Sequence, residues 1–144
     1  MPTTWGVTPK QSLEATCRSI GRASVVAQCV AILNGVEADP PFLAVLAGPA
    51  SRAVLDGRIG GLNGYWPEVW AARGLLHVWD DDAVEAIIAT AADPSWRVRE
   101  MSAKVIARHR VLPAIDAVMV LLNDQNARVR AAAHRAFETI TDEE

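Results

Sequence analysis

The feature of this 144-residue sequence that most constrains its fold is a self-similarity with a period of 31 residues, the separation of Asp93 from Asp124. A shift by that period superimposes segments 97–99 and 128–130, which both read Arg-Val-Arg. The other matched pairs are Ser102 with Ala133 and Ile106 with Phe137, and a weaker earlier copy matches Trp70 with Met101, Ala71 with Ser102 and Leu75 with Ile106. A period of this length is typical of chains built from stacked supersecondary units.

Apolar residues recur at three- and four-residue spacing through the second half of the chain, which indicates amphipathic helices. The pattern predicts helices over 66–79, 81–92, 95–109, 113–122 and 127–140. The turns between them are short and rich in Asp, Asn and Ser, which cap helix N-termini. Helices joined by such short turns must pack as antiparallel neighbours, so we expect an all-α protein.

The first part of the chain does not fit the period. Thr8-Pro9-Lys10-Gln11 is typical of a helix start with a capping box. One apolar stripe is expected to run from there to Asn34, with Gly21 either kinking the helix or splitting it; its members are Leu13, Cys17, Ile20, Ala23, Ala27 and Val30. Asp39-Pro40-Pro41 repeats the start signal, and Gly48-Pro49 interrupts the apolar segment after it, so we expect two further short helices.

Glycine is concentrated in the segment 57–64, which holds four glycines in eight residues. Glycine-rich loops can bind phosphate, but a phosphate-binding loop of that kind follows a strand and ends in Gly-Lys-Ser or Gly-Lys-Thr. Neither feature is found here. We therefore interpret Gly57–Gly64 as a connecting loop and leave open whether it moves.

The repeated pattern is similar to that of the HEAT-like helical repeat family. The residues that carry the resemblance are Asp93, Val98, Arg99, Ser102 and Ile106 in one unit, and Asp124, Val129, Arg130, Ala133 and Phe137 in the next. The resemblance implies a short right-handed α-α superhelix. In this interpretation residues 1–144 form a single domain, in which residues 65–140 are the repeats and residues 1–60 are an N-terminal helical cap over the open end.

Stacking of such units gives each repeated position a structural role. We expect the small residues Ser102, Ala103, Ala132 and Ala133 to allow close helix approach, and Val98, Ile106, Val129 and Phe137 to fill the interior. Stacking should also bring repeated charges into rows. Arg99 and Arg130 are predicted to pair with the turn aspartates Asp93 and Asp124, of their own or the next unit, as a ladder between units.

Six side chains are candidates for partner binding: Trp66, Trp96, Arg97, Arg108, Arg110 and Arg128. Trp66 and Trp96 flank turns and are expected to be half-exposed, and large aromatic residues and arginines often dominate protein interfaces. Trp70 and Trp79 are expected in the interior. The favoured hypothesis is a non-enzymatic scaffold or adaptor that binds another protein.

Charge distribution supports one alternative. Residues 93–135 carry eight Lys and Arg against four Asp and Glu, although the whole chain has a net charge of −3. A row of arginines could follow a phosphate backbone. The alternative is therefore a nucleic-acid-binding module that uses the basic face of residues 97–135, as in the DNA alkylation-repeat glycosylases of the same fold type. The short chain and its negative charge disfavour that enzyme activity.

The remaining classes of function find little support. His77, His109 and His134 lie on different predicted helices without metal-ligand spacing, so no metal, cofactor or catalytic residue is expected. Cys17 and Cys29 would lie roughly 18 Å apart along one helix, too far for a disulfide. No apolar run is long enough to span a membrane and the N-terminus lacks a signal-peptide pattern, so we expect a cytoplasmic protein. A third hypothesis is a homodimer, because so short a stack of helix pairs leaves an apolar end surface to cover.

Overall fold

The computed structural model describes residues 6–55 and 66–142, and all regular structure in these ranges is helical. The elements are α1 (Pro9–Ile20), α2 (Arg22–Leu33), α3 (Pro40–Ala47), α4 (Ala50–Leu55), α5 (Trp66–His77), η1 (Asp81–Ala83), α6 (Val84–Thr90), α7 (Trp96–His109), η2 (Leu112–Ala114), α8 (Ile115–Leu121) and α9 (Ala127–Thr141). The five helices predicted from the repeat are present, although a 3₁₀ turn precedes both α6 and α8. The predicted loop Gly57–Gly64 lies outside the described residues.

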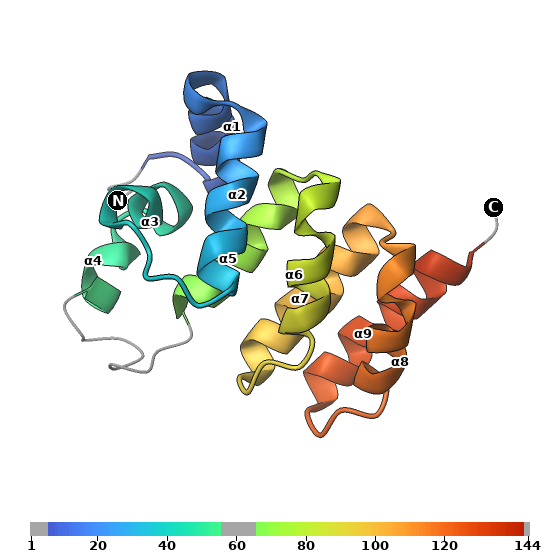
Figure 1. Cartoon of the computed structure of the whole chain (residues 1–144). Helices are drawn as coiled ribbons and strands as arrows, with labels where there is room; N and C mark the ends of the chain where they lie inside the picture. Colours follow the sequence, from blue (N-terminus) through green and yellow to red (C-terminus); the bar gives the residue numbers. More distant parts are fainter. Residues whose placement is uncertain (1–5, 56–65, 143–144) are drawn as a thin grey trace.

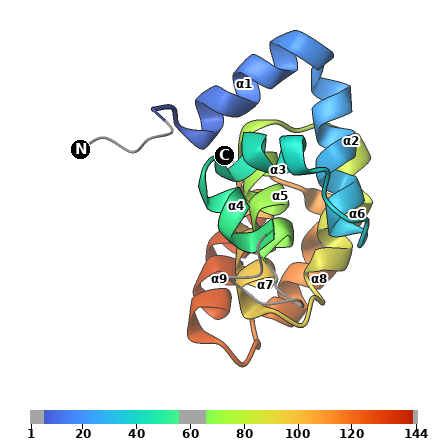
Figure 2. The same ribbon diagram turned by 90° about the vertical axis from the view of Figure 1, so that its left-hand side faces the viewer.

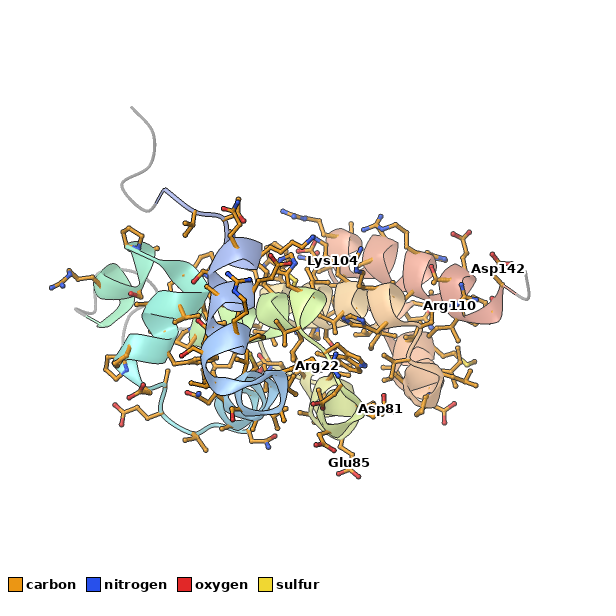
Figure 3. All side chains as sticks on the ribbon, turned by 90° about the horizontal axis from the view of Figure 1, so that it is seen from above. Arg22, Asp81, Glu85, Lys104, Arg110 and Asp142 are labelled. Atoms are coloured by element: carbon orange, nitrogen blue, oxygen red, sulfur yellow. The ribbon has the colours of Figure 1, made fainter. Side chains whose placement is uncertain are left out.

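The helices are arranged in two layers. Figure 1 shows α6 and α8 in front of α7 and α9. Figure 3 is seen from above and shows α2 (light blue) and α6 (yellow-green) side by side in this same layer. Contacts join α2 with α5, α6 with α7 and α8 with α9, and they also join α5, α7 and α9 in sequence. The first helix pair is therefore α2 with α5, so α2 takes the place that α6 and α8 take in the later pairs.

Local signals explain where the first helices begin. The Thr8 hydroxyl accepts the Gln11 amide at 3.1 Å and the Gln11 side chain accepts the Thr8 amide at 2.8 Å, which completes the predicted capping box. Asp39 caps α3 in front of Pro40 by accepting the Phe42 amide at 3.4 Å. A new helix starts at Ala50, after Gly48 and Pro49, so the two expected short helices are present.

Gly21 splits the N-terminal helix, and the predicted apolar stripe is wrong at Ile20, Ala23 and Ala27. The φ of Gly21, 92°, belongs to the region that favours glycine, and this residue separates α1 from α2. Ile20, at the end of α1, is 45% exposed; beyond the break Ala23 and Ala27 are exposed, whereas Val30 is half-buried against the core. The side chains of α2 that are buried are Val25, Val26, Cys29 and Ile32.

The predicted distance between Cys17 and Cys29 assumed one continuous helix, and the break at Gly21 removes that assumption. Both nevertheless have free thiols, and Cys29 lies in the core. Burial, with a smaller contribution from Cys17, raises the pKa of Cys29 to about 12. Cys29 is therefore a protonated, apolar core residue at neutral pH.

The core runs without interruption from α1 to α9. The small residues of the repeat, Ser102, Ala103, Ala132 and Ala133, are buried as expected, and so are Val98, Ile106 and Val129. Phe137 was expected in the interior but is only half-buried. Within the described residues, the main contacts of its helix, α9, are with α7 and α8.

Gly74 marks the place where the N-terminal helices pack onto the repeats. A Cβ atom at this position would lie 3.0 Å from Leu46 of α3, 3.4 Å from Cys29 of α2 and 3.6 Å from Leu13 of α1. Figure 2 shows α3 and α4 in front of α5, with α1 above them. The repeat places Val105 and Ala136 at the positions equivalent to Gly74. Helix α5 thus has no side chain at the position where α1, α2 and α3 approach it.

Candidate functional site

The candidate binding surface lies at the N-terminal ends of α5, α7 and α9. Trp66, Arg97 and Arg128 are separated by one period each, and each lies in the first turn of its helix. Trp96 begins α7 beside Arg97. Because α5, α7 and α9 pack in sequence, these four side chains come together. We call Trp66, Trp96, Arg97 and Arg128 the tryptophan-arginine surface.

Aromatic rings and guanidinium groups alternate across this surface. The Arg97 guanidinium carbon lies 4.5 Å from the ring centre of Trp96 and 5.7 Å from that of Trp66. The Arg128 guanidinium lies 5.3 Å from the Trp96 ring. Each contact is within the range of cation-π attraction, worth about 0.5–1 kcal/mol at an exposed site. Two arginines from successive units therefore hold Trp96 in place while it remains half-exposed, as predicted.

Trp66 is held from its other side. Its ring centre lies 6.0 Å from that of Trp70, at an interplanar angle of 31°. Trp70 is buried at 6% exposure, in agreement with the prediction, and Trp66 is half-exposed. The two tryptophans lie four residues apart on one helix face, so the buried ring fixes the orientation of the accessible one.

An acidic residue that the sequence analysis did not single out lies beside this surface. Glu100 is only 9% exposed, and its carboxylate accepts a hydrogen bond from Arg128 Nε at 3.2 Å and lies 3.5 Å from Lys104 Nζ. A buried carboxylate requires such partners. Because Arg128 is 66% exposed, the pair contributes little to stability, but it fixes the direction of the Arg128 side chain.

The four residues of the predicted ladder also have defined places. Arg99 donates two hydrogen bonds to the carboxylate of Asp124 in the next unit, from Nε at 2.8 Å and from Nη2 at 3.1 Å. Its Nη1 donates to the Asp93 and Pro94 carbonyls of its own turn. Arg130 donates in the same way to the Asp124 and Gln125 carbonyls. The side chain of Arg99 thus joins α7 to the turn before α9.

The carboxylates of the two turn aspartates also cap the turns. Asp93 accepts the Ser95 amide at 2.8 Å, and Asp124 accepts the Asn126 amide at 2.9 Å. Burial alone would raise the pKa of Asp124. The hydrogen bonds from Arg99 and from the Asn126 amide, together with the charges of Arg99 and Arg130, hold that pKa below its ordinary value.

The equivalent position one unit earlier is occupied by an acid. Glu68 lies one period before Arg99, and Asp93 lies one period before Asp124. Burial raises the pKa of Glu68, the Glu68 backbone amide lowers it, and the negative charge of Asp93 raises it again, with a net increase. One carboxylate oxygen of Glu68 is buried without a hydrogen-bond partner. The α5–α7 junction therefore has two acids where the next junction has an ion pair.

Arg108 and Arg110, predicted to bind a partner with the others, lie at the opposite end of α7. Eleven residues separate Arg97 from Arg108, roughly 16 Å along the helix axis. Arg110 follows the helix with a φ of 51°, and its guanidinium donates to the Asp142 carbonyl at 2.8 Å. The six candidates thus form one cluster of four and a separate pair.

Trp79 was predicted in the interior and is only half-buried. It follows the C-terminal end of α5 and stacks on His109 of α7, with ring centres 4.6 Å apart and an interplanar angle of 12°. His109 Nε2 lies 2.6 Å from the Leu75 carbonyl, which fixes the imidazole against the indole. The position ends the helix rather than continuing its buried face, so one edge of the indole reaches solvent.

An exposed apolar face on η2 and α8 was also not anticipated. Leu112, Met119 and Val120 are 62%, 51% and 73% exposed. Their spacing of seven and eight residues would have placed them on one face of the predicted helix 113–122 and its flank. Among the described side chains, His, Cys, Asp and Glu form no group of three that could hold a metal ion.

No helix within residues 6–55 and 66–142 is both long enough and apolar enough to cross a membrane. The chain matches no known protein family, no curated protein and no solved structure.

Proposed function

We propose that this chain is a non-enzymatic protein-binding scaffold, in which HEAT-like helix pairs form a short right-handed α-α superhelix. The two-layer packing of three helix pairs and the Arg99–Asp124 bridge between equivalent turns support the repeat architecture. The proposed contact region is the tryptophan-arginine surface. The observation that carries this proposal is the position of Trp96, which is half-exposed and in contact with the guanidinium groups of two successive units.

Such an arrangement favours binding for an energetic reason. Ordering a long side chain on association costs about 0.5–1.5 kcal/mol. Arg97 and Arg128 are already ordered against Trp96, and Glu100 also holds Arg128, so part of this cost has been met before binding. Tryptophan and arginine are also the residue types most enriched among interface hot spots. We expect a partner that presents acidic and apolar side chains together.

The test is capture of a partner by the immobilised full-length chain from nuclease-treated extract of its source cells. Four proteins are compared: the wild type, Trp96→Ala, the double variant Arg97→Glu with Arg128→Glu, and the double variant Arg108→Glu with Arg110→Glu. The double variant Arg108→Glu with Arg110→Glu is the matched control, because it reverses the same number of charges at the other end of α7. The proposal predicts a stoichiometric protein retained by the wild type and by the last variant and lost from the other two. Equal loss from both double variants would contradict it.

A second candidate function is nucleic-acid binding through the basic face of residues 97–135. Besides Arg97 and Arg128, the repeat aligns three further cations, Arg73, Lys104 and Arg135, at one position of α5, α7 and α9. Binding of a labelled single-stranded or double-stranded oligonucleotide would then weaken steeply with added salt, because each phosphate contact releases counterions. Binding that persists at high salt, or is absent at low salt, rules out this function.

A further inference from the structure

A concave region lies between the N-terminal helices and the C-terminal ends of α5 and α7. It is a wide, open pocket of about 760 Å³, and its lining residues are Glu14, Cys17, Arg18, Arg22, His77, Val78, Trp79 and His109. We call it the junction hollow. Figure 3 looks onto this end of the molecule, where Arg22, Asp81 and Arg110 lie in that order along it. The tryptophan-arginine surface lies at the opposite end of α7.

The junction hollow has a positive electrostatic character. Arg18, Arg22 and His77 are all exposed within it. Burial lowers the pKa of His77, and the charges of Arg73, Lys10 and Arg108 lower it further, while Glu14 alone opposes them. Cations from α1, α5 and α7 therefore act on His77, and Arg22 of α2 acts on Cys17, which also lines the hollow.

Helix ends account for only part of this charge. Arg18 and Arg108 lie in the last turns of α1 and α7, where cations interact favourably with terminal carbonyls. Each helix end carries only about half an elementary charge, however, which is less than one arginine. Arg22 lies in the first turn of α2, where a cation is unfavourable, so helix-end stabilisation does not explain its position.

An aromatic wall accompanies the cations. Trp79 and His109 stack in parallel, and the Leu75 carbonyl fixes the imidazole. The pair also borders a second hollow of about 360 Å³ on its other side, lined in part by Asp81, Arg110 and Leu112. A half-buried indole between two hollows is a rigid apolar surface that reaches solvent.

We propose that the junction hollow binds a small organic phosphate, with Arg18 and Arg22 on the phosphate oxygens and Trp79 against the organic part. Its volume lies within the usual range of small-molecule sites, about 300–1,000 Å³. Arginine is suited to phosphate because its planar guanidinium can donate two parallel hydrogen bonds.

The test uses two probes that carry the same diphosphate group, inorganic pyrophosphate and ADP, titrated calorimetrically into the full-length chain at fixed ionic strength. We expect both to bind, with ADP about tenfold tighter because only ADP has an organic part for Trp79. We also expect the indole N–H resonance of Trp79 to shift on addition of ADP. Equal affinities and an unmoved Trp79 resonance would overturn the assignment of the organic part.

Variants of the lining residues test where the phosphate groups of the two probes bind. Arg18→Ala with Arg22→Ala is expected to weaken both probes at least about tenfold, and His77→Ala to weaken them less. These residues are exposed, so the variants should fold, which circular dichroism checks. The matched control, Arg97→Ala with Arg128→Ala, removes two charges from the tryptophan-arginine surface and should leave both affinities unchanged. Absence of binding at millimolar probe, or equal weakening by the control, would overturn the proposal without affecting the proposed scaffold function.

Discussion

Two junctions join the three long helices α5, α7 and α9, and equivalent residues meet at each of them. At the α7–α9 junction Arg99 donates two hydrogen bonds to Asp124, and the pair is largely buried, with side chains 18% and 10% exposed. At the α5–α7 junction Glu68 takes the place of the arginine, close enough to Asp93 for the two charges to repel. One junction has its buried charges paired, and the other places like charges together.

The α5–α7 junction is held by other contacts. His109 bonds to the Leu75 carbonyl, and Arg97 lies over Trp66. The difference indicates that the first unit is specialised. It lacks the ladder arginine at Glu68 and the side chain at Gly74, and it is the unit on which α1 and α3 pack.

The largest expected effect is at the α7–α9 junction. Asp124→Ala removes the partner of a largely buried guanidinium and a cap of the turn, so we expect the free energy of unfolding to fall by roughly 2–4 kcal/mol. Asp93→Ala is the matched control, because Asp93 caps its turn by the same hydrogen bond without an arginine on its carboxylate. We expect that control to cost less than about 1 kcal/mol in urea denaturation, because the loss of its repulsion with Glu68 offsets part of the lost cap. Equal losses would mean that the ion pair contributes nothing.

The next effect is at Gly74. Gly74→Val places methyl groups where a Cβ alone would meet Leu46 at 3.0 Å, so we expect a loss of about 1–3 kcal/mol from overpacking. Gly74→Ala is less informative, because its gain in helix propensity of about 1 kcal/mol opposes the crowding. Thermal unfolding would measure both. A Val variant as stable as the wild type would show that the N-terminal helices do not depend on this close approach.

A smaller effect, of opposite sign, is expected at Glu68. Glu68→Gln removes a like charge beside Asp93 and should raise the free energy of unfolding by about 0.5–1 kcal/mol. Glu68→Arg should raise it by about 1 kcal/mol, because an arginine there can reach Asp93 as Arg99 reaches Asp124. Urea denaturation at neutral pH would measure both changes. A Glu68→Gln variant less stable than the wild type would contradict the unfavourable environment of this carboxylate.

The two junctions should also differ in their response to pH. The folded-state pKa of Asp124 is depressed, so its stabilising contribution is present above the unfolded pKa of about 4 and is lost as pH falls through the folded value. The folded-state pKa of Glu68 is raised, so its penalty is absent below about pH 4 and appears as pH rises through the folded value.

Stability measured from about pH 3 to about pH 7 for the wild type, Asp124→Asn and Glu68→Gln would separate these contributions. We expect the wild type to lose its advantage over Asp124→Asn at acid pH, and Glu68→Gln to lose its advantage over the wild type there. A difference between the wild type and either variant that does not change with pH would contradict the corresponding pKa shift.

Much of the helical structure was predictable because its signals are local. Thr8 with Gln11, and Asp39 with Pro40, fix two helix starts through hydrogen bonds and backbone geometry that involve only a few neighbouring residues. The effect of Gly21 was not predictable, because a glycine can kink a helix or end it, and tertiary packing decides. The buried stripe of α2 then followed from the break.

The candidate surface was predictable in part. The repeat places Trp66, Arg97 and Arg128 at one position, so their row could have been found from the period alone, as could the replacement of Arg99 by Glu68. The contact of Trp96 with two arginines depends on side-chain directions that spacing does not give. Arg108 and Arg110 lie far from Arg97 because α7 separates them by most of its length. Their shared positive charge alone does not indicate this distance.

That successive helix pairs are equivalent units, with junctions set by one period position, is tested most directly by a double-mutant cycle between position 68 and Asp93→Asn, with Glu68→Gln as the uncharged reference for Glu68→Arg. Denaturation of Glu68→Gln and Glu68→Arg, each with Asp93 and with Asp93→Asn, gives the coupling free energy without the repulsion between Glu68 and Asp93. Equivalence predicts a favourable coupling of about 1 kcal/mol, because the new arginine meets Asp93 as Arg99 meets Asp124. A coupling indistinguishable from zero would contradict it.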